Sequence, residues 1–230
     1  AASTLFLTHL IFYLSIQHPP RSTLFPYTTL FRSFMISGKM NQTNKHNKVV
    51  LLLLTFFFTF PVHALELPEL LNLFAQQHQS TVDFNEEKHT FYLDEPITSS
   101  GYLQFFAPNK LLKFILKPEK ISQKINGDQL EIINSDETHT INLNDHPEFS
   151  IILRSIINLL SGNLAALKKD FKIVFENTST EWILSLSPHD SYVSGYVESI
   201  KMFGNKNKLS KIIVTEPNND RSITHLYNHR

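Results

Sequence analysis

Hydrophobic positions follow a helical period at the start of the strongly patterned part of the chain, near residue 66. Leucine and phenylalanine recur at i, i+3, i+4 and i+7, which predicts an amphipathic helix over residues 66–78. Pro68 suits the first turn of this helix, where a backbone N–H has no helical partner to lose. The apolar positions are Leu67, Leu70, Leu71 and Phe74.

From residue 81 the chain alternates between hydrophobic and polar residues, which is typical of β-strands. Asn126-Gly127, between two alternating stretches, is a typical two-residue hairpin turn. Within residues 111–117, the lysines should share one face of the strand, and leucine and phenylalanine the other. The strands predicted here cover residues 81–88, 101–107, 111–117, 121–125, 130–133 and 138–143.

The alternation stops before residue 147, and the next segment is hydrophobic on nearly every side. We predict a helix over residues 147–162, ended by Gly162, and a shorter helix over residues 163–169. A helix this apolar is buried on most sides or covers an apolar surface. Strands resume over residues 171–175, 182–186, 197–203, 209–215 and 222–227, with a turn at residues 205–207.

This order of elements predicts an α+β fold dominated by antiparallel strands. A sheet of about 8–11 strands is too large to stay flat with one face exposed. We therefore expect an incomplete antiparallel β-barrel, that is, a curved sheet with a helical lid on its concave side.

The first 64 residues are interpreted as two segments outside the folded domain. Residues 1–34 contain TLFPYTTLFRS, which resembles the in-frame translation of a sequencing adapter, so we interpret them as an assembly artefact. Residues 35–64 resemble a signal peptide, with a start at Met35 or Met40, lysines, an apolar run over residues 49–60 and a cut after Ala64. The apolar run is shorter than the roughly 20 residues that a membrane span needs. We expect the mature domain, residues 65–230, in the periplasm.

Charge is unevenly distributed, although 21 basic and 21 acidic residues balance over the whole chain. Five basic and no acidic residues lie in the first 64 positions, which leaves 16 basic against 21 acidic residues in the mature region. This excess of acid argues against a nucleic-acid partner. The chain has no cysteine, which excludes disulfides, thiol catalysis, zinc–cysteine sites and lipid attachment through cysteine.

No residue pattern indicates catalysis. The five glycines of the mature region are not spaced for a phosphate or dinucleotide loop, and neither G-x-S-x-G nor H-E-x-x-H occurs. His189-Asp190 could belong to a metal or catalytic site, but a solvated turn is the simpler interpretation. Glu86 and Glu87 are neighbours in a strand and should point to opposite faces. We therefore expect no enzyme activity, no metal and no cofactor.

Motifs spread over the mature region resemble the LolA-like outer-membrane lipoprotein carrier family, in particular a LolA-related periplasmic branch found beside lipid and polyene biosynthesis genes. The similarity covers residues 66–227. The motifs are Phe84-x-Glu86, Leu93-x-x-Pro96, Ser99-Ser100-Gly101-x-Leu103-x-Phe105-x-Ala107-Pro108, Leu112, Leu160-Ser161-Gly162, Leu167, Phe171 and Trp182-x-Leu184-x-Leu186-x-Pro188.

The resemblance implies an incomplete β-barrel whose helical lid covers an apolar cavity for an acylated cargo, either lipoprotein or lipid. It also implies an inner-membrane exporter and an outer-membrane acceptor as partners. Classical carriers have an arginine that latches the lid just before the proline that ends the second strand. This chain has Ala107 at that position, so the resemblance supplies no latch there.

Strand alternation and the apolar insert nominate the residues of the site. The predicted cavity face is Leu103, Phe105, Leu112, Phe114, Leu116, Phe171, Ile173, Phe175, Trp182, Leu184 and Leu186. The predicted lid residues are Phe149, Ile152, Leu153, Ile156, Ile157 and Leu160. For any single residue, ordinary core packing is an equal alternative. For the whole protein, the alternatives to a monomeric lipid carrier are a periplasmic interaction or assembly factor with a closed core and, less favoured, an acyl hydrolase.

Overall fold

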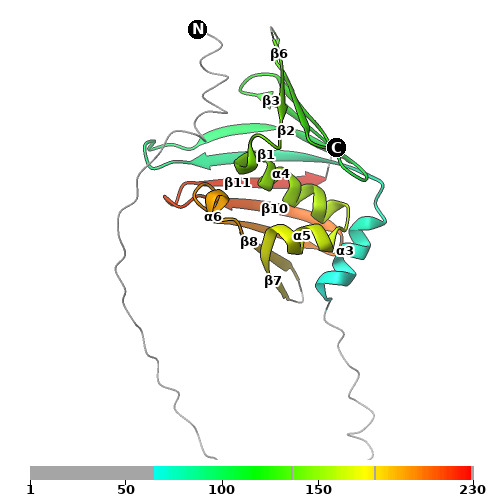
Figure 1. The fold of residues 1–230 in the computed structure, drawn as a ribbon. Helices are drawn as coiled ribbons and strands as arrows, with labels where there is room; N and C mark the ends of the chain where they lie inside the picture. Colours follow the sequence, from blue (N-terminus) through cyan, green and yellow to red (C-terminus); the bar gives the residue numbers. More distant parts are fainter. Residues whose placement is uncertain (1–64, 136, 179, 229–230) are drawn as a thin grey trace, which may run out of the picture. The chain divides into compact units, whose positions relative to one another are not determined.

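A computed structural model of the chain describes residues 65–135, 137–178 and 180–228 (Figure 1). The adapter-like segment, the predicted signal peptide and the predicted cleavage site after Ala64 therefore lie outside the described residues. Within them, no helix is long and apolar enough to cross a membrane.

The described residues build one antiparallel sheet of 11 strands in the order β6-β5-β4-β3-β2-β1-β11-β10-β9-β8-β7. Strands β1 to β6 form one meander and β7 to β11 another, and the pairing of β1 with β11 joins them. The strands are β1 (Gln79–His89), β2 (Ile97–Phe106), β3 (Lys110–Lys117), β4 (Ile121–Asn126), β5 (Gln129–Ile133), β6 (Thr138–Asn142), β7 (Phe171–Asn177), β8 (Trp182–Pro188), β9 (Ser199–Asn205), β10 (Lys208–Thr215) and β11 (Arg221–Asn228). The predicted large, curved and unclosed antiparallel sheet is confirmed.

The two edge strands, β6 and β7, are consecutive strands of the chain. The helices α4 (Pro147–Leu160) and α5 (Leu164–Asp170) connect them and lie across one face of the sheet (Figure 1). The helix α3 (Leu67–Ala75) precedes β1, and the one-turn helix α6 (Ser191–Ser194) follows β8. All four helices contribute to one core with this face of the sheet, which we call the inner face.

Local signals explain where the helices begin and end. The α3 helix starts with a capping box in which the Glu66 N–H donates to Oε2 of Glu69 at 3.2 Å. Gly162 follows α4 with a φ of 71°, and a Cβ there would lie 2.5 Å from the carbonyl oxygen of Leu71. The chain can therefore turn sharply against α3 only because position 162 is glycine.

One local prediction needs correction. The β4–β5 hairpin places Gly127 and Asp128 in its two-residue loop, because Asn126 already pairs with Gln129. His189 and Asp190 lie exposed in the loop between β8 and α6, as the solvated-turn interpretation predicted. The Asp190 carboxylate accepts hydrogen bonds from two backbone N–H groups and thereby caps the short helix α6.

The strand register also corrects one predicted face. Leu103 of β2 pairs with Lys113 of β3, so these two side chains share a face. Because Leu103 lies on the inner face, the residues that alternate with Lys113 lie on the outer one. These residues are Leu112 and Phe114. Phe114 stacks there on Tyr102, with ring centroids 4.6 Å apart.

Candidate functional site

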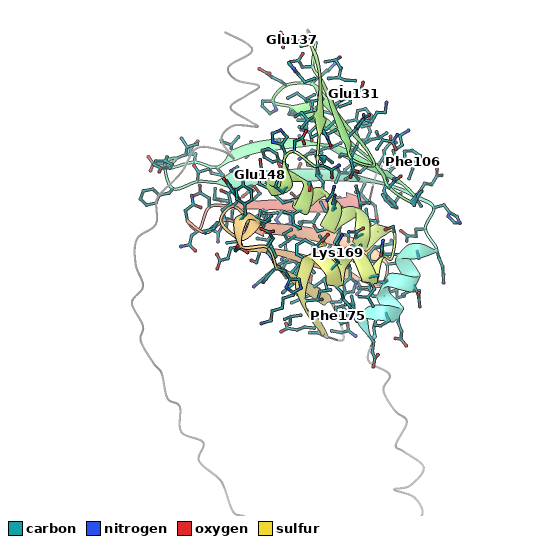
Figure 2. The ribbon with its side chains drawn as sticks, in the orientation of Figure 1. Phe106, Glu131, Glu137, Glu148, Lys169 and Phe175 are labelled. Atoms are coloured by element: carbon teal, nitrogen blue, oxygen red, sulfur yellow. The ribbon has the colours of Figure 1, made fainter. Side chains whose placement is uncertain are left out.

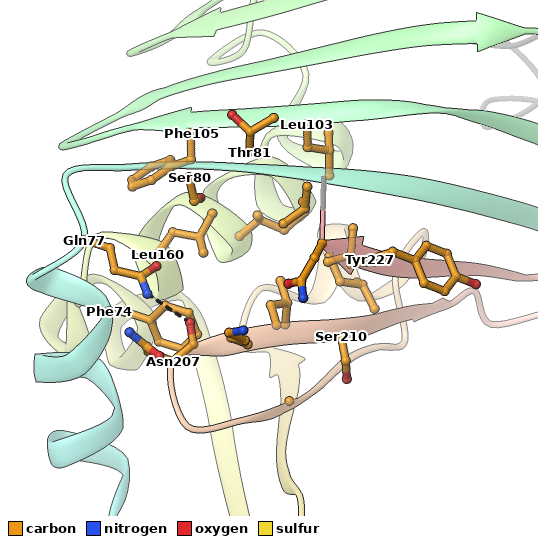
Figure 3. A pocket seen from close by; sticks show the side chains of 18 of the residues that line it. Phe74, Gln77, Ser80, Thr81, Leu103, Phe105, Leu160, Asn207, Ser210 and Tyr227 are labelled. Carbon is orange, nitrogen blue, oxygen red and sulfur yellow. Dashed lines mark hydrogen bonds between the residues drawn. The ribbon is translucent and has the colours of Figure 1, made fainter. Parts of the chain in front are cut away.

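A cavity of about 660 Å³ lies between the inner face of the sheet and the helices α3 and α4 (Figure 3). It lies where β1 and β10 begin and where β2 and β11 end. Its apolar wall comes from both meanders and both helices. This wall consists of Phe74, Val82, Leu103, Phe105, Leu111, Ile156, Leu160, Leu209, Ile212 and Leu226.

The register of the central strands opens the sheet at this end. The pairing of β1 with β11 begins at Val82 and Asn228, and that of β10 with β11 begins at Lys211 and His225. Residues 79–81 of β1 therefore lie beyond the last described pair with β11, and residues 208–210 of β10 run alongside residues 226–228 of β11 without pairing with them. They flank the cavity, and we call this opening, formed by residues 79–81, 208–210 and 227–228, the mouth.

Uncharged polar side chains surround the apolar wall. Gln77 donates through Nε2 to the carbonyl oxygen of Asn207 at 3.4 Å, which links the end of α3 to the β9–β10 turn (Figure 3). Of the residues that line the cavity, Lys208 and Glu181 carry charge, one of each sign. The remaining polar members are Gln77, Gln79, Ser80, Thr81, Asn205, Asn207, Ser210, Tyr227 and Asn228.

The helix α4 contributes residues both to the cavity lining and to the main core, and Ile156 and Leu160 contact both. Ile156 and Leu160, one turn apart, line the cavity. Ile151 and Leu159 are buried in the main core, with exposures of 9% and 0%. Of the other predicted lid residues, Ile152 packs against the core, Ile157 is buried, and Phe149 and Leu153 are half-buried.

Polar contacts anchor both halves of α4. Glu148 is buried at its N-terminal end (Figure 2), and its Oε1 lies 3.4 Å from Nδ1 of His146. In the second turn of the helix, Arg154 Nη2 donates to Asp128 Oδ1 at 2.8 Å and to Asn144 Oδ1 at 2.7 Å. The hydrogen bonds from Asn144 and from Arg154 hold the pKa of the Asp128 carboxyl below its usual range. We call this three-residue contact the tether, because it joins α4 to the β4–β5 turn and to the loop after β6.

The latch position suggested by the resemblance does not face α4. Ala107 is exposed just beyond β2, and its N–H donates to the carbonyl oxygen of His78 at 2.9 Å. An inward orientation of this position, which the role of the arginine in classical carriers implies, is therefore not found for Ala107. The cationic contact of α4 comes instead from Arg154 on the helix itself, which bonds Asp128 and Asn144. No pattern in the sequence identified these partners of Arg154.

The structure divides the eleven predicted cavity-face residues into three groups. Leu103 and Phe105 line the cavity. Six residues of β7 and β8 belong to the main core or pack against it, away from the cavity lining: Phe171, Ile173, Phe175 (Figure 2), Trp182, Leu184 and Leu186. Of the three residues of β3, Leu112 and Phe114 lie on the outer face by register, and Leu116 is 50% exposed and does not line the cavity.

Trp182 forms part of the packing next to the cavity. It is 1% exposed, its Nε1 donates to the carbonyl oxygen of Lys206 at 2.7 Å, and its ring meets that of Phe74 edge to face at 6.0 Å. Gly204, which lines the cavity, lies against the indole. This indole therefore supports the cavity wall without lining it.

The inner face becomes charged farther along β1. Glu86 Oε2 accepts hydrogen bonds from Lys113 Nζ and from Thr224 Oγ1, both at 2.9 Å. Lys88 pairs with Glu216 at 3.3 Å, and burial raises the pKa of the Glu216 carboxyl, against the lowering effect of Lys88. Glu87 instead lies beside His89, 3.2 Å away, so Glu86 and Glu87 point to opposite faces as predicted. In the described part of the chain, no cluster of three or more potential metal ligands occurs.

The β1–β2 loop carries an exposed aromatic tip at the opposite end of β1 from the mouth. Phe91, Tyr92 and Leu93 are 84%, 61% and 43% exposed. The N–H of Phe91 donates to the buried Asp220 carboxylate at 2.8 Å, which fixes the base of the tip against the β10–β11 loop. The tip therefore projects from the domain outside the core, and the Phe91–Asp220 hydrogen bond fixes its base.

Comparison with known proteins gives one family match and several structural matches. Residues 60–227 match the family model described as outer membrane lipoprotein carrier protein LolA-like. The chain matches no curated protein. Among solved structures, a LolA superfamily protein from Nitrosomonas europaea is 9% identical, with a TM-score of 0.38, over 73% of this chain and 95% of that one. The lipoprotein LppX from Mycobacterium tuberculosis is 11% identical, with a TM-score of 0.34, over 69% of this chain and 93% of that one. LprF from Mycobacterium bovis is 9% identical, with a TM-score of 0.29, over 70% of this chain and 91% of that one.

Proposed function

The chain belongs to the LolA-like outer membrane lipoprotein carrier family, and on this premise we propose that it carries an acylated or otherwise lipophilic molecule through the periplasm. The cargo would occupy the cavity beneath α4 while it crosses from the inner to the outer membrane. The main support for this proposal is the 660 Å³ cavity with its apolar wall, because a closed, fully packed core would leave no such space.

The physical need for such a carrier follows from the hydrophobic effect. Each methylene moved from an apolar environment into water costs about 0.8 kcal/mol, so a free acyl chain crosses an aqueous compartment rarely. An apolar cavity removes most of the free-energy cost of exposing the acyl chain to water. This function requires no bond to be made or broken, and we assign no catalytic residue.

We further propose that α4 moves aside when cargo is loaded. Ile156 and Leu160 cover the cavity, but α4 takes part in no strand pairing. Its displacement would break side-chain contacts and the tether while the sheet keeps its backbone hydrogen bonds. We therefore retain α4 as the lid.

The remaining parts of the proposal concern export and partners. Residues 35–64 would act as a cleaved signal peptide, leaving a monomeric domain that starts at Leu65, and residues 1–34 would not belong to the protein. N-terminal sequencing of the exported protein tests the cut, and an N-terminus upstream of residue 49 would contradict it. An inner-membrane exporter would load the domain and an outer-membrane acceptor would unload it.

The direct test is organic extraction of the protein after its purification from a periplasmic fraction. Mass spectrometry should find a lipophile at close to one equivalent per chain, released when the protein is unfolded. The alternative, an interaction or assembly factor, is favoured by the exposed aromatic tip at Phe91–Leu93. A lipid-free protein that also fails to bind the apolar dye N-phenyl-1-naphthylamine would support that alternative and refute the carrier.

A further inference from the structure

We infer that the exposed aromatic tip at Phe91–Leu93 is a membrane-contact site, whose side chains enter the surface of a bilayer of zwitterionic phospholipid. This inference goes beyond the proposed carrier function and does not depend on it. It rests on the residues that form the tip, the contacts that fix its backbone, its size, and the charges beside it.

The residues of the tip are unusual for a turn in water. The N–H of Leu93 donates to the carbonyl oxygen of Thr90 at 3.3 Å, so Phe91 and Tyr92 are the central residues of a four-residue turn. Glycine, proline, asparagine, aspartate and serine usually occupy such turns, because they suit the backbone geometry and the solvent. Two aromatic side chains in water at these positions break this local rule without any gain in packing, which is typical of a functional site.

The backbone of the tip is fixed although its side chains lie in water. Asp220, only 4% exposed, accepts the hydrogen bond from the Phe91 N–H. The rings of Phe91 and Tyr92 meet edge to face, with centroids 5.6 Å apart. Below the tip, the last residue of β1, His89, pairs with Arg221 of β11. Binding through the tip therefore needs little further ordering of the chain.

The size and shape of the tip favour a bilayer over a protein partner. A large apolar side chain has roughly 200 Å² of surface, so the three exposed side chains offer about 400 Å². A stable protein interface buries about 800 Å² on each partner and needs a complementary surface. A bilayer needs neither, because lipids rearrange around a narrow projection, and aromatic side chains favour the boundary between head groups and acyl chains.

The end of the sheet that carries the tip lies away from the mouth. The strands β1 and β8 both end there, so α6, which follows β8, lies at the same end as the tip (Figure 1). Tyr192 of α6 is 58% exposed and adds a second aromatic side chain to this end. The mouth lies where β1 begins. Contact with a bilayer through the tip would therefore leave the mouth in water.

The charges beside the tip select the kind of bilayer. Asp94 and Glu95 are exposed directly after it, and the loop between β1 and β2 has no basic residue. Lys88 and His89, just before the tip, each pair with a glutamate, and Arg221 adds one exposed positive charge. Carboxylates are attracted by the ammonium groups of zwitterionic head groups and repelled by an anionic surface. We therefore expect insertion driven by the apolar side chains and opposed by anionic lipid.

The first test is flotation of the protein, purified from a periplasmic fraction, with vesicles of phosphatidylcholine and phosphatidylethanolamine in equal parts. The wild-type protein should float with the vesicles. Phe91→Ser removes the most exposed side chain of the tip and should lower the affinity by about tenfold or more. Val174→Ser removes a 47% exposed apolar side chain from β7 and should leave the affinity unchanged. All variants share one N-terminus, so a difference between them comes from the substitution.

A tryptophan at the tip reports insertion directly. Trp182 is 1% exposed, so its emission provides a constant background. The emission of Phe91→Trp should shift to shorter wavelength when vesicles are added, and phosphatidylcholine brominated on its acyl chains should quench it. Flotation of this variant without shift or quenching would place the contact elsewhere on the domain and overturn the inference.

Vesicle charge tests the role of the acidic residues. Replacing the phosphatidylethanolamine with phosphatidylglycerol should weaken wild-type binding by about fivefold or more, since each charge near such a surface contributes a factor of about five. Asp94→Asn combined with Glu95→Gln should remove this difference. Glu176→Gln, which neutralises an exposed acid of β7, should retain it. Stronger wild-type binding to the phosphatidylglycerol vesicles would overturn the choice of a zwitterionic surface.

Dye binding separates this inference from the carrier function. Without vesicles, Phe91→Ser should bind N-phenyl-1-naphthylamine as the wild-type protein does, because the cavity mouth lies at the other end of the sheet. A wild-type protein that binds the dye but no vesicles, or whose Phe91→Ser variant floats equally well, would overturn the membrane contact and leave the tip to a protein partner. Vesicle binding through Phe91 without dye binding would overturn the carrier function alone.

Discussion

Replacing Ile156 with aspartate tests whether α4 acts as a lid. Ile156 is half-buried and lines the cavity, so losing its side chain removes about 1 kcal/mol of apolar contact, half the value of a fully buried isoleucine. The new carboxylate would face the apolar wall, and a polar group buried without a partner costs a further 1–3 kcal/mol or so. Together these terms oppose the closed position by about 2–4 kcal/mol. Affinity for a lipid probe should fall by a factor of roughly 30 to 1,000.

The measurement needs a stability readout beside the binding assay. Trp182 is the only tryptophan of the chain and is 1% exposed, so its fluorescence reports unfolding of the sheet in urea. Ile156→Asp should weaken binding of N-phenyl-1-naphthylamine and shift the urea midpoint by less than the loss in binding, because Ile151 and Leu159 still hold the other side of α4. Asn158→Asp adds the same charge to the same helix outside the cavity lining and serves as the control.

Two results would refute the lid assignment. The first is normal dye binding by the folded Ile156→Asp protein. The second is a loss of stability by the full 2–4 kcal/mol or so with unchanged affinity of the fraction that remains folded, because α4 would then be ordinary packing.

Arg154→Ala should increase amide exchange across residues 147–160 by removing the tether, and an unchanged profile would show that packing alone holds the helix. Acid should weaken the tether of the wild-type protein in the same way. Asn144 and Arg154 depress the pKa of Asp128 in the folded state, so the stabilisation by the Asp128 carboxylate is complete above the ordinary carboxyl pKa and is lost as the pH falls through the depressed pKa. Amide exchange, corrected for its intrinsic pH dependence, should therefore rise only below about pH 4. Gly204→Ala should lower the free energy of unfolding in urea by about 1–3 kcal/mol, because a Cβ would collide with the indole and with a backbone oxygen of β10, and a normal urea midpoint would mean that the two strands can separate at no cost. Ala107→Arg should leave exchange across residues 147–169 unchanged, since Ala107 is exposed; slower exchange would place this residue against the lid.

The elements of the fold could be predicted because their signals are local. The helix from Leu67, the alternation from residue 81 and the apolar insert near residue 147 are all patterns within a few residues of sequence. Antiparallel pairing of consecutive strands then follows from short connections. The helix α6 was missed because four residues are too few for a period, although the Asp190 cap is a recognisable signal.

The site could be predicted only in part because it depends on register between strands. Alternation places residues of one strand on two faces but does not say which face continues across the neighbouring strand. The pairing of Leu103 with Lys113 decides this for β3, and a register shift beside Gly101 precedes it. The mouth lies where β10 and β11 no longer pair, beyond Lys211 and His225, which no pattern within those strands encodes. Apolar residues such as Val82, Leu111 and Leu226 were therefore missed.

The connection of the two edge strands through α4 and α5 also bears on how this architecture can diversify. Because β6 and β7 do not pair with each other, an insertion, deletion or substitution between residues 143 and 170 shifts no rung of the sheet. Each meander keeps its own hairpins, and the β1–β11 pairing keeps them together. The residues that cover the cavity from this side can therefore vary in sequence and length without any change in the pairing of the 11 strands.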